Sequence, residues 1–237
     1  MVAIGFSTGC LYREGMSYEN MIRFYESVGA SAIELGFNRL QTLKSFEPTK
    51  KVASALKGFE YVSIHAPFVD FKYIKDKKTA EVLAKLEAIC EKLPVKTVVM
   101  HPDVVRDFSY LSSRDLPIAF ENMDLGKNFG NKLEDIQKLA KDGFGFVLDL
   151  QHAYENDSSM AVINGLIRVM GKRIRQIHIS GQTSNENHIA TYMANNKEEI
   201  VKVLTKSPRV SIICEGVLVG NIEKSAKKEL KLIAESF

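Results

Sequence analysis

The chain has 237 residues, enough for one large domain or two small ones, and 45% of them are hydrophobic. With 26% charged residues, the composition is that of a soluble globular protein with a substantial core. The formal net charge of +3 is too small to indicate a nucleic-acid or membrane partner by itself, and it excludes neither.

Short, β-rich apolar segments alternate along the chain with longer amphipathic ones. Eight segments predict strands, at residues 2–7, 31–36, 61–66, 97–101, 117–122, 145–150, 175–180 and 210–216. Helical patterns are predicted from Ser17, a capping residue, to Gly29, and at residues 79–93, 132–142, 158–171, 196–206 and 221–235. The strand segments are nearly continuous apolar runs, which is typical of parallel strands buried on both faces.

Eight strands with intervening helices in a chain of this length predict a single (β/α)8 barrel, for which about 250 residues are typical. A doubly wound open sheet is the alternative. Between His101 and Pro117 only 15 residues remain, so we expect the fourth crossover helix to be truncated. No change of composition and no linker-like tract divides the chain, so we expect one domain over residues 1–237.

The cysteines and the N-terminal segment predict the cellular compartment of the protein. Cys10, Cys90 and Cys214 are odd in number and widely spaced, so they indicate neither a zinc knuckle nor a redox motif. Isolated thiols are typical of a reducing compartment. The N-terminal segment has no basic leader, and no stretch approaches the roughly 20 apolar residues that span a bilayer. We therefore expect a cytoplasmic protein without a membrane partner.

Ionisable side chains stand at the ends of six predicted strands. The residues that end strands three to eight are, in order, His65, His101, Glu121, Asp149, His178 and Glu215. The carboxyl ends of barrel strands share the face on which active sites form, so these side chains are expected to converge. Crowded ionisable groups repel one another or stay desolvated unless a cation joins them, and this pattern predicts a metal site. Strand two adds Glu34, whose role the pattern leaves open.

The chain has five histidines, and the two not yet named follow the same strand ends. His152 lies three residues after Asp149, where the chain turns toward a helix. His188 lies in the loop after strand seven, with Glu186 two residues before it. Nitrogen and oxygen ligands without nearby thiolates suit Zn, Mn, Fe or Co better than Mg or Ca. Eight or nine ligands exceed the needs of one ion, which predicts a cluster.

Six motifs resemble those of the endonuclease IV family (AP endonuclease family 2), within the wider xylose-isomerase-like TIM-barrel superfamily. They occur in that family's order and span most of the chain: "SIHAPF", "VMHPD", "AFENMDLG", "VLDLQHAY", "QIHIS" and "CEG". The Asp-x-x-His pair and the Glu-Asn after strand five are the most specific elements. The segment "GFNRLQTLKSFEP" is loosely similar to that family's DNA-contacting loop.

The resemblance implies a site for three zinc ions. The first ion would be held by His65, His101 and Glu121. The second would be held by a bridging Glu121 with Asp149, His178 and Glu215. The third would be held by His152 and His188, with Glu186 where the family has Asp. In that family the ions bind the phosphate beside an abasic site and activate water for in-line attack, which implies a hydrolase of DNA repair.

The related sugar isomerases and epimerases imply a smaller site. By that resemblance one divalent ion, with Mn, Co or Mg as options besides Zn, would be held by Glu121, Asp149, His178 and Glu215. His152 would touch the substrate, and paired carboxylates would move protons through an enediolate. We therefore treat Glu121, Glu215 and His152 as the candidate catalytic residues.

The two interpretations differ in how many histidines they use. The isomerase leaves His65, His101 and His188 without a shared purpose, whereas the phosphoester hydrolase uses all five. We therefore predict a metal-dependent hydrolase acting at abasic-site DNA or a related phosphoester, with two or three zinc ions. A sugar isomerase or epimerase acting on a small sugar or sugar phosphate is the alternative, and a noncatalytic metal or sugar-binding barrel is a third class.

Duplex DNA is usually held by many Lys or Arg contacts to phosphates. The candidates in the loops are Arg13, Arg39, Lys44, Arg106 and Arg114. Each is explained more simply as a solvated surface charge. Damaged DNA as a partner is therefore implied by the family resemblance rather than by the basic residues.

Overall fold

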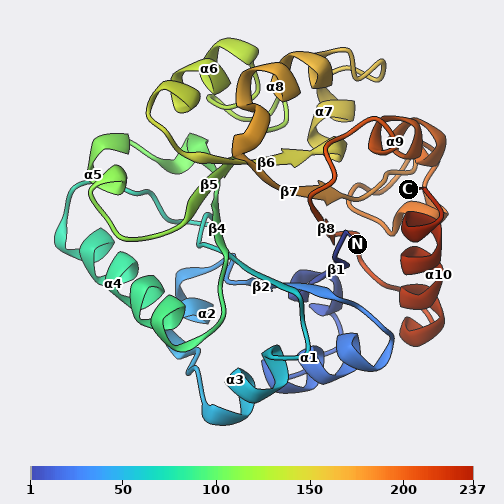
Figure 1. Ribbon diagram of the computed structural model, residues 1–237, viewed down its shortest axis with the longest axis horizontal. Coiled ribbons are helices and arrows are strands. Elements are labelled where there is room, and N and C mark those ends of the chain that lie inside the picture. Colours follow the sequence, from blue (N-terminus) through green and yellow to red (C-terminus); the bar gives the residue numbers. More distant parts are fainter. Residues whose placement is uncertain (1, 237) are drawn as a thin grey trace.

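The computed structural model describes residues 2–236, in which eight parallel strands close into a barrel with helices around it (Figure 1). The strands follow one another around the barrel in chain order, and β1 pairs with both β2 and β8. They span Ile4–Ser7 (β1), Ala32–Gly36 (β2), Tyr61–His65 (β3), Thr97–Met100 (β4), Ile118–Glu121 (β5), Gly145–Asp149 (β6), Ile174–Ile179 (β7) and Ser211–Cys214 (β8). The predicted (β/α)8 barrel is confirmed, and the open sheet is wrong.

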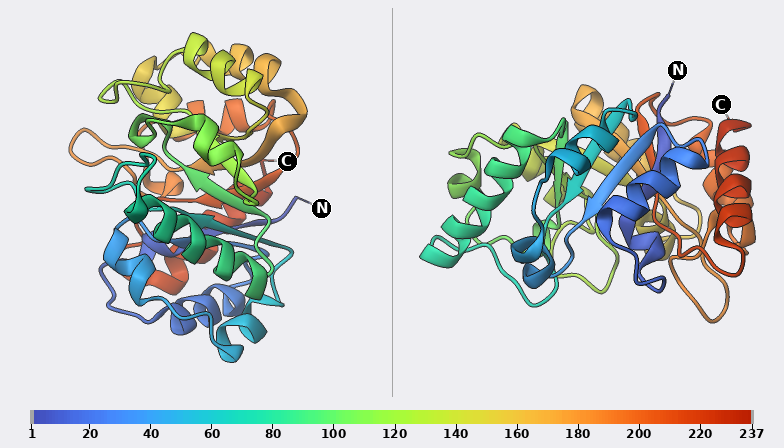
Figure 2. Two further views of the ribbon diagram at one scale, coloured as in Figure 1. Left: turned by 90° about the vertical axis from the view of Figure 1, so that its left-hand side faces the viewer. Right: turned by 90° about the horizontal axis from the view of Figure 1, so that it is seen from below.

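The helices lie outside the strands and cover the barrel on all sides (Figures 1 and 2). The α-helices are Tyr18–Ser27 (α1), Leu40–Ser45 (α2), Lys50–Leu56 (α3), Lys77–Lys92 (α4), Phe108–Ser112 (α5), Leu133–Lys141 (α6), Leu150–Asn156 (α7), Val162–Met170 (α8), Lys197–Leu204 (α9) and Ile222–Ala234 (α10). Four 3₁₀ helices are Thr8–Leu11 (η1), Pro102–Val104 (η2), Gly171–Arg173 (η3) and Thr191–Met193 (η4). Along residues 2–236, no helix is long and apolar enough to cross a membrane.

Local signals explain where these helices begin and end. The Ser17 side chain accepts a hydrogen bond from the backbone of Asn20 and caps α1, and Gly29 follows that helix with a φ of +89°. Within residues 2–236, the only α-helix between β4 and β5 is the five-residue α5, which follows the 3₁₀ helix η2, so the truncated fourth crossover helix is confirmed. The sequence does not predict α2 and α3, because helices of six and seven residues are too short to show a clear period.

Alternation along the strands decides which side chains fill the barrel. On β3, Tyr61, Ser63 and His65 share the inner face, and on β7 Gln176 and His178 share it, because every second residue of a strand points the same way. Below the strand ends the inner face is mixed: Val99, Ala119 and Val147 form an apolar cluster, and polar residues such as Ser63 and Gln176 are also buried there. The strands end in ionisable side chains, so the fold brings these side chains together at the C-terminal end of the barrel.

Candidate metal centre

Two groups of side chains meet at the C-terminal ends of the strands, and within each group the ligand atoms lie within 4.8 Å of one another. The first group contains His65, His101 and Glu121. The second contains Glu121, Asp149, His178 and Glu215. The structure thus brings together the six side chains that the sequence places at the strand ends. Glu121 belongs to both groups.

The Glu121 carboxylate faces the two groups with different oxygens. Its Oε2 lies 3.4 Å from His65 Nε2 and 3.7 Å from His101 Nε2. Its Oε1 lies 3.5 Å from His178 Nδ1, which in turn lies 3.2 Å from Glu215 Oε2. Glu121 is 1% exposed, so this orientation is set by the surrounding barrel. The carboxylate is therefore arranged as a bridge.

These spacings fit a metal ion better than direct hydrogen bonds. Two ligand atoms at about 2.0–2.2 Å from one ion, separated by the tetrahedral angle, are about 3.3–3.6 Å apart. Several buried ligand atoms have no hydrogen-bond partner in the part of the chain described, among them Glu121 Oε2, Asp149 Oδ2 and His178 Nδ1. Unpaired buried polar atoms are costly, and divalent cations would satisfy them. The mixed nitrogen and oxygen set suits zinc, manganese or cobalt.

Burial and neighbouring charges set the protonation of the site. Burial lowers the pKa of His101 well below its usual range, so this ring is neutral. Burial also acts to lower the pKa of His178, but the carboxylates of Glu215, Glu34 and Glu121 outweigh it and raise that pKa well above the usual range. Burial raises the pKa of Asp149 strongly. Without a metal ion, these shifts favour protonation of His178 and Asp149.

We expect metal binding to release protons at pH 7. The raised pKa of His178 keeps its ring protonated at neutral pH, and a metal ion binds only after Nδ1 loses its proton, so affinity should rise with pH. Calorimetric titration with zinc in two buffers of different ionisation enthalpy measures the protons released. Equal heats in both buffers would show that these groups are already deprotonated.

Asn122 clamps two strand ends together. Its Nδ2 donates to the Asp149 carbonyl, and its Oδ1 accepts from the Asp149 N–H, both at 2.8 Å. Asn122 is buried, so this pair of hydrogen bonds fixes the backbone that carries one candidate ligand. The sequence singles out this Glu-Asn motif by family resemblance, and the structure supplies a physical reason for the asparagine.

Replacing Asn122 with alanine should therefore lower stability and metal affinity together. The change removes both hydrogen bonds to the buried Asp149 backbone, and a buried polar group left without a partner costs about 1–3 kcal/mol. Urea unfolding of the metal-free protein measures the first effect, and zinc competition with a chelating dye measures the second. A variant of unchanged stability would mean that the clamp contributes nothing.

His152 and His188 lie beside the two groups rather than in them. His152 Nδ1 lies 2.9 Å from the Asn122 carbonyl and 3.2 Å from Glu121 Oε1. The His188 ring lies 5.6 Å from the His152 ring, and its Nδ1 lies 3.1 Å from Ser180 Oγ. His188 has a φ of +53°, an uncommon conformation for a residue other than glycine.

Glu186 is exposed and lies within electrostatic range of Arg13. Within residues 2–236 it joins neither group of possible ligands. A third metal held by His152, His188 and Glu186 therefore stays a prediction.

A cavity of about 300 Å³ opens above the strand ends. It is lined by candidate ligands, by His152 and His188, and by Tyr12, Asn38, Phe68, Asp124 and Lys127. Phe68 stacks on His101 with ring centres 3.9 Å apart. Phe71 and Tyr73 are buried against each other and do not line the cavity.

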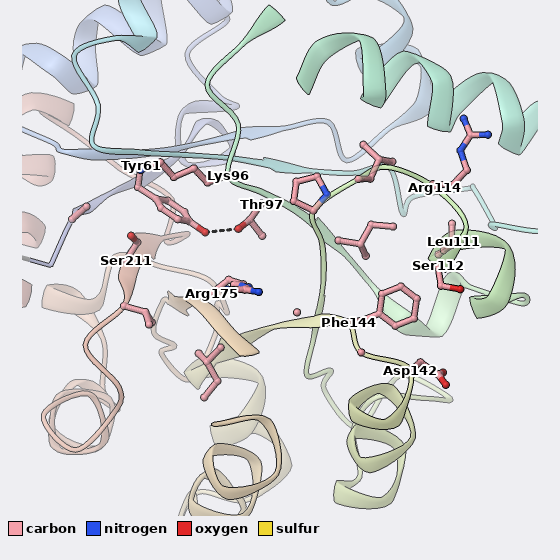
Figure 3. A pocket seen from close by; sticks show the side chains of 18 of the residues that line it. Tyr61, Lys96, Thr97, Leu111, Ser112, Arg114, Asp142, Phe144, Arg175 and Ser211 are labelled. Atoms are coloured by element: carbon pink, nitrogen blue, oxygen red, sulfur yellow. Dashed lines mark hydrogen bonds between the residues drawn. The ribbon is translucent and has the colours of Figure 1, made fainter. Parts of the chain in front are cut away.

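A larger cavity, of about 740 Å³, lies among the starts of the strands and the loops before them (Figure 3). The hydrogen bond between Tyr61 and Thr97 crosses it. Arg114, which lines it, is already paired with Glu87. None of the candidate ligands lines this cavity. We therefore expect the chemistry at the smaller cavity, which Arg114 does not line.

Sequence reasoning does not find the polar residues one layer below the ligands. Ser63 and Gln176 are buried on the inner face of the barrel and hydrogen-bond to Glu34. The signal available in the sequence is their position two residues before His65 and His178, since that spacing puts them on the same face of a strand.

No known family model matches the sequence, and a comparison with curated proteins finds no match. Solved structures do match. Endonuclease IV from Thermus thermophilus is 18% identical with a TM-score of 0.71, over 99% of this chain and 98% of that one. D-allulose 3-epimerase from Methylomonas sp. is 13% identical with a TM-score of 0.74, over 100% and 98%.

The IolI protein, solved with a bound zinc atom, is 18% identical with a TM-score of 0.68, over 100% of this chain and 99% of that one. At such low identity, likeness in structure establishes the fold alone. The chain has the barrel fold shared by endonuclease IV and the xylose-isomerase-like proteins, as its sequence motifs imply.

Proposed function

We propose that this chain is a metal-dependent phosphoester hydrolase whose centre holds two divalent ions, with zinc the best fit to the ligands. The observation that carries this proposal is the Glu121 carboxylate, which turns one oxygen toward His65 and His101 and the other toward His178. An isomerase needs only the second group. The first group, with two buried histidines, has a purpose only if a second ion binds there.

Two bound ions would lower the pKa of water and stabilise charge on the attacking and leaving oxygens of a phosphoester. The chain itself supplies groups that hold and move protons. His152 Nδ1–H donates a hydrogen bond to the Asn122 carbonyl. Burial acts to lower the pKa of His152, but the carboxylates of Asp149 and Glu121 outweigh it and raise that pKa well above the usual range, so Nε2 can donate a proton in the cavity. Glu215 is half-buried and lines the same cavity, so its carboxylate meets the substrate directly.

The size of the cavity fits a small reacting group. Its volume of about 300 Å³ is at the low end for small-molecule sites, which suits one sugar phosphate unit, either free or turned out of an abasic DNA strand. Arg39, a candidate phosphate contact, is exposed and paired with Asp70. Among the described residues, Lys127 is the only lysine or arginine that lines the cavity. We therefore propose an anionic phosphoester as substrate, with abasic-site DNA as the first choice.

A sugar isomerase or epimerase is the second candidate, because the second group alone is a complete set of four ligands. The small cavity also suits a free monosaccharide. One divalent ion and a pair of carboxylates flanking a hydroxy-ketone would meet the needs of that chemistry.

Metal analysis and parallel assays separate the two candidates. Zinc-loaded protein should contain at least two ions per chain and should cleave either an abasic-site duplex or a simple aryl phosphodiester. The matched comparison is the same preparation offered a panel of ketoses. One ion per chain together with epimerisation of a ketose, and no phosphoester cleavage, would contradict the hydrolase and favour the isomerase.

A further inference from the structure

A fourth carboxylate, Glu34, lies behind the second group and belongs to neither group of possible ligands. It is 0% exposed and stands on β2, inside the barrel. Its Oε2 lies 3.1 Å from His178 Nε2, the ring nitrogen opposite the one that faces Glu121 and Glu215. Within residues 2–236, no other carboxylate lies within 4.0 Å of that Nε2.

The Glu34 carboxylate is held in place by two further contacts. The Ser63 hydroxyl donates to Oε2 at 3.0 Å, and the Gln176 amide donates to the same oxygen at 2.8 Å. Both residues are fully buried. An ionised side chain with no access to solvent is costly unless it is paired, and the partners of Glu34 are these two residues and the His178 ring.

We propose that Glu34 is a positioning residue that fixes the ring of His178 in the one tautomer able to bind a metal ion. The carboxylate accepts a hydrogen bond from the Nε2–H group, so Nε2 keeps its proton and the proton lost on metal binding is that of Nδ1, which faces Glu121 and Glu215. A carboxylate behind a histidine also increases the basicity of the nitrogen that binds the metal. This inference rests on the proposed metal centre and assigns a role to a residue outside its ligands.

The neighbouring Gln176 shows why a carboxylate is needed at this position. Its amide nitrogen lies 2.6 Å from His178 Nε2. An amide N–H donates to a ring nitrogen only when that nitrogen carries no proton, which would put the ring's proton on Nδ1. Glu34 and Gln176 therefore favour opposite tautomers. Removing the charge of Glu34 leaves Gln176 to favour the tautomer that cannot bind a metal through Nδ1.

Zinc competition titration with a chelating dye, carried out on the full chain, tests this role without any assay of activity. Glu34→Gln should lower the affinity for one of the two zinc ions by about 10–100-fold, because Glu34 lies behind the second group only. The affinity for the other ion should stay at the wild-type value. A cobalt-loaded sample should show the same split, with the absorption of one of the two ions altered.

Glu229→Gln is the matched control. Glu229 is also buried, but it accepts hydrogen bonds from the backbone of Thr191 and Tyr192, away from the centre. This variant should lose stability and keep both zinc affinities. A merely structural role for Glu34 would make the two variants behave alike.

If Glu34→Gln does not fold, Ser63→Ala serves instead, because it removes one contact that holds Glu34 and keeps the charge. Ser63→Ala should lower the affinity for the same ion by a smaller factor. Unchanged affinity for both ions in a folded Glu34 or Ser63 variant would overturn the proposed role of Glu34. The proposed hydrolase function would not be affected by that result. A wild-type chain that binds fewer than two ions overturns the proposed centre itself.

Discussion

Replacing Glu121 with glutamine should abolish binding of both metal ions at once. Each oxygen of this carboxylate faces a different group, and the amide that replaces it has one donor end and no negative charge. Loss of a partner outside the ligand set costs about 10–100-fold in affinity, so loss of a shared ligand should cost more than about 100-fold for each ion. Phosphoester cleavage should fall to background.

The measurement is zinc stoichiometry and affinity by dye competition, with thermal unfolding to confirm that the barrel remains folded. Glu223→Gln is the control, because Glu223 is an exposed acid on α10, paired with Lys227. It should behave as wild type. If Glu121→Gln lost one ion and kept the other at full affinity, Glu121 would be a ligand of one site and not a bridge.

Replacing Gly5 with alanine should lower the stability of the fold more than the other substitutions proposed. A Cβ at this position would lie 1.6 Å from the Ala32 carbonyl oxygen, inside the paired strands β1 and β2. The obstacle is backbone, so it cannot rotate aside, and the cost should reach or exceed the upper end of the about 1–3 kcal/mol typical of overpacking.

Thermal unfolding of the metal-free protein checks this expectation. In a chain of this size each kcal/mol shifts Tm by about 2–4 °C, so a drop of at least about 6 °C is expected. Gly36→Ala is the matched control on β2, since its Cβ would meet only atoms at 3.5 Å. Equal Tm values for the two variants would mean that the close approach at Gly5 is relieved at little cost.

The ends of the strands could be predicted because each short apolar run stops at an ionisable residue, and a parallel barrel puts all such ends on one face. His65, His101 and Glu121 therefore meet as their places in the sequence suggest. The orientation of the Glu121 oxygens could not be predicted, because it depends on the rotamer and on neighbours from several strands.

The contact between Glu34 and His178 could not be predicted either. The two residues are 144 positions apart, and they meet only because the closed barrel turns β2 and β7 toward a common interior. Glu186 is exposed and joins neither group within the part of the chain described, so its role as a ligand stays a prediction. Its spacing of two residues from His188 does not determine where a loop places its carboxylate.

Anomalous diffraction at the zinc edge, from crystals of the zinc-loaded protein, tests the central proposal most directly. We predict two strong peaks on opposite sides of the Glu121 carboxylate, one beside His65 and His101 and the other beside Asp149, His178 and Glu215. A single peak at the second group, with His65 and His101 hydrogen-bonded to protein or water, would contradict the two-ion centre.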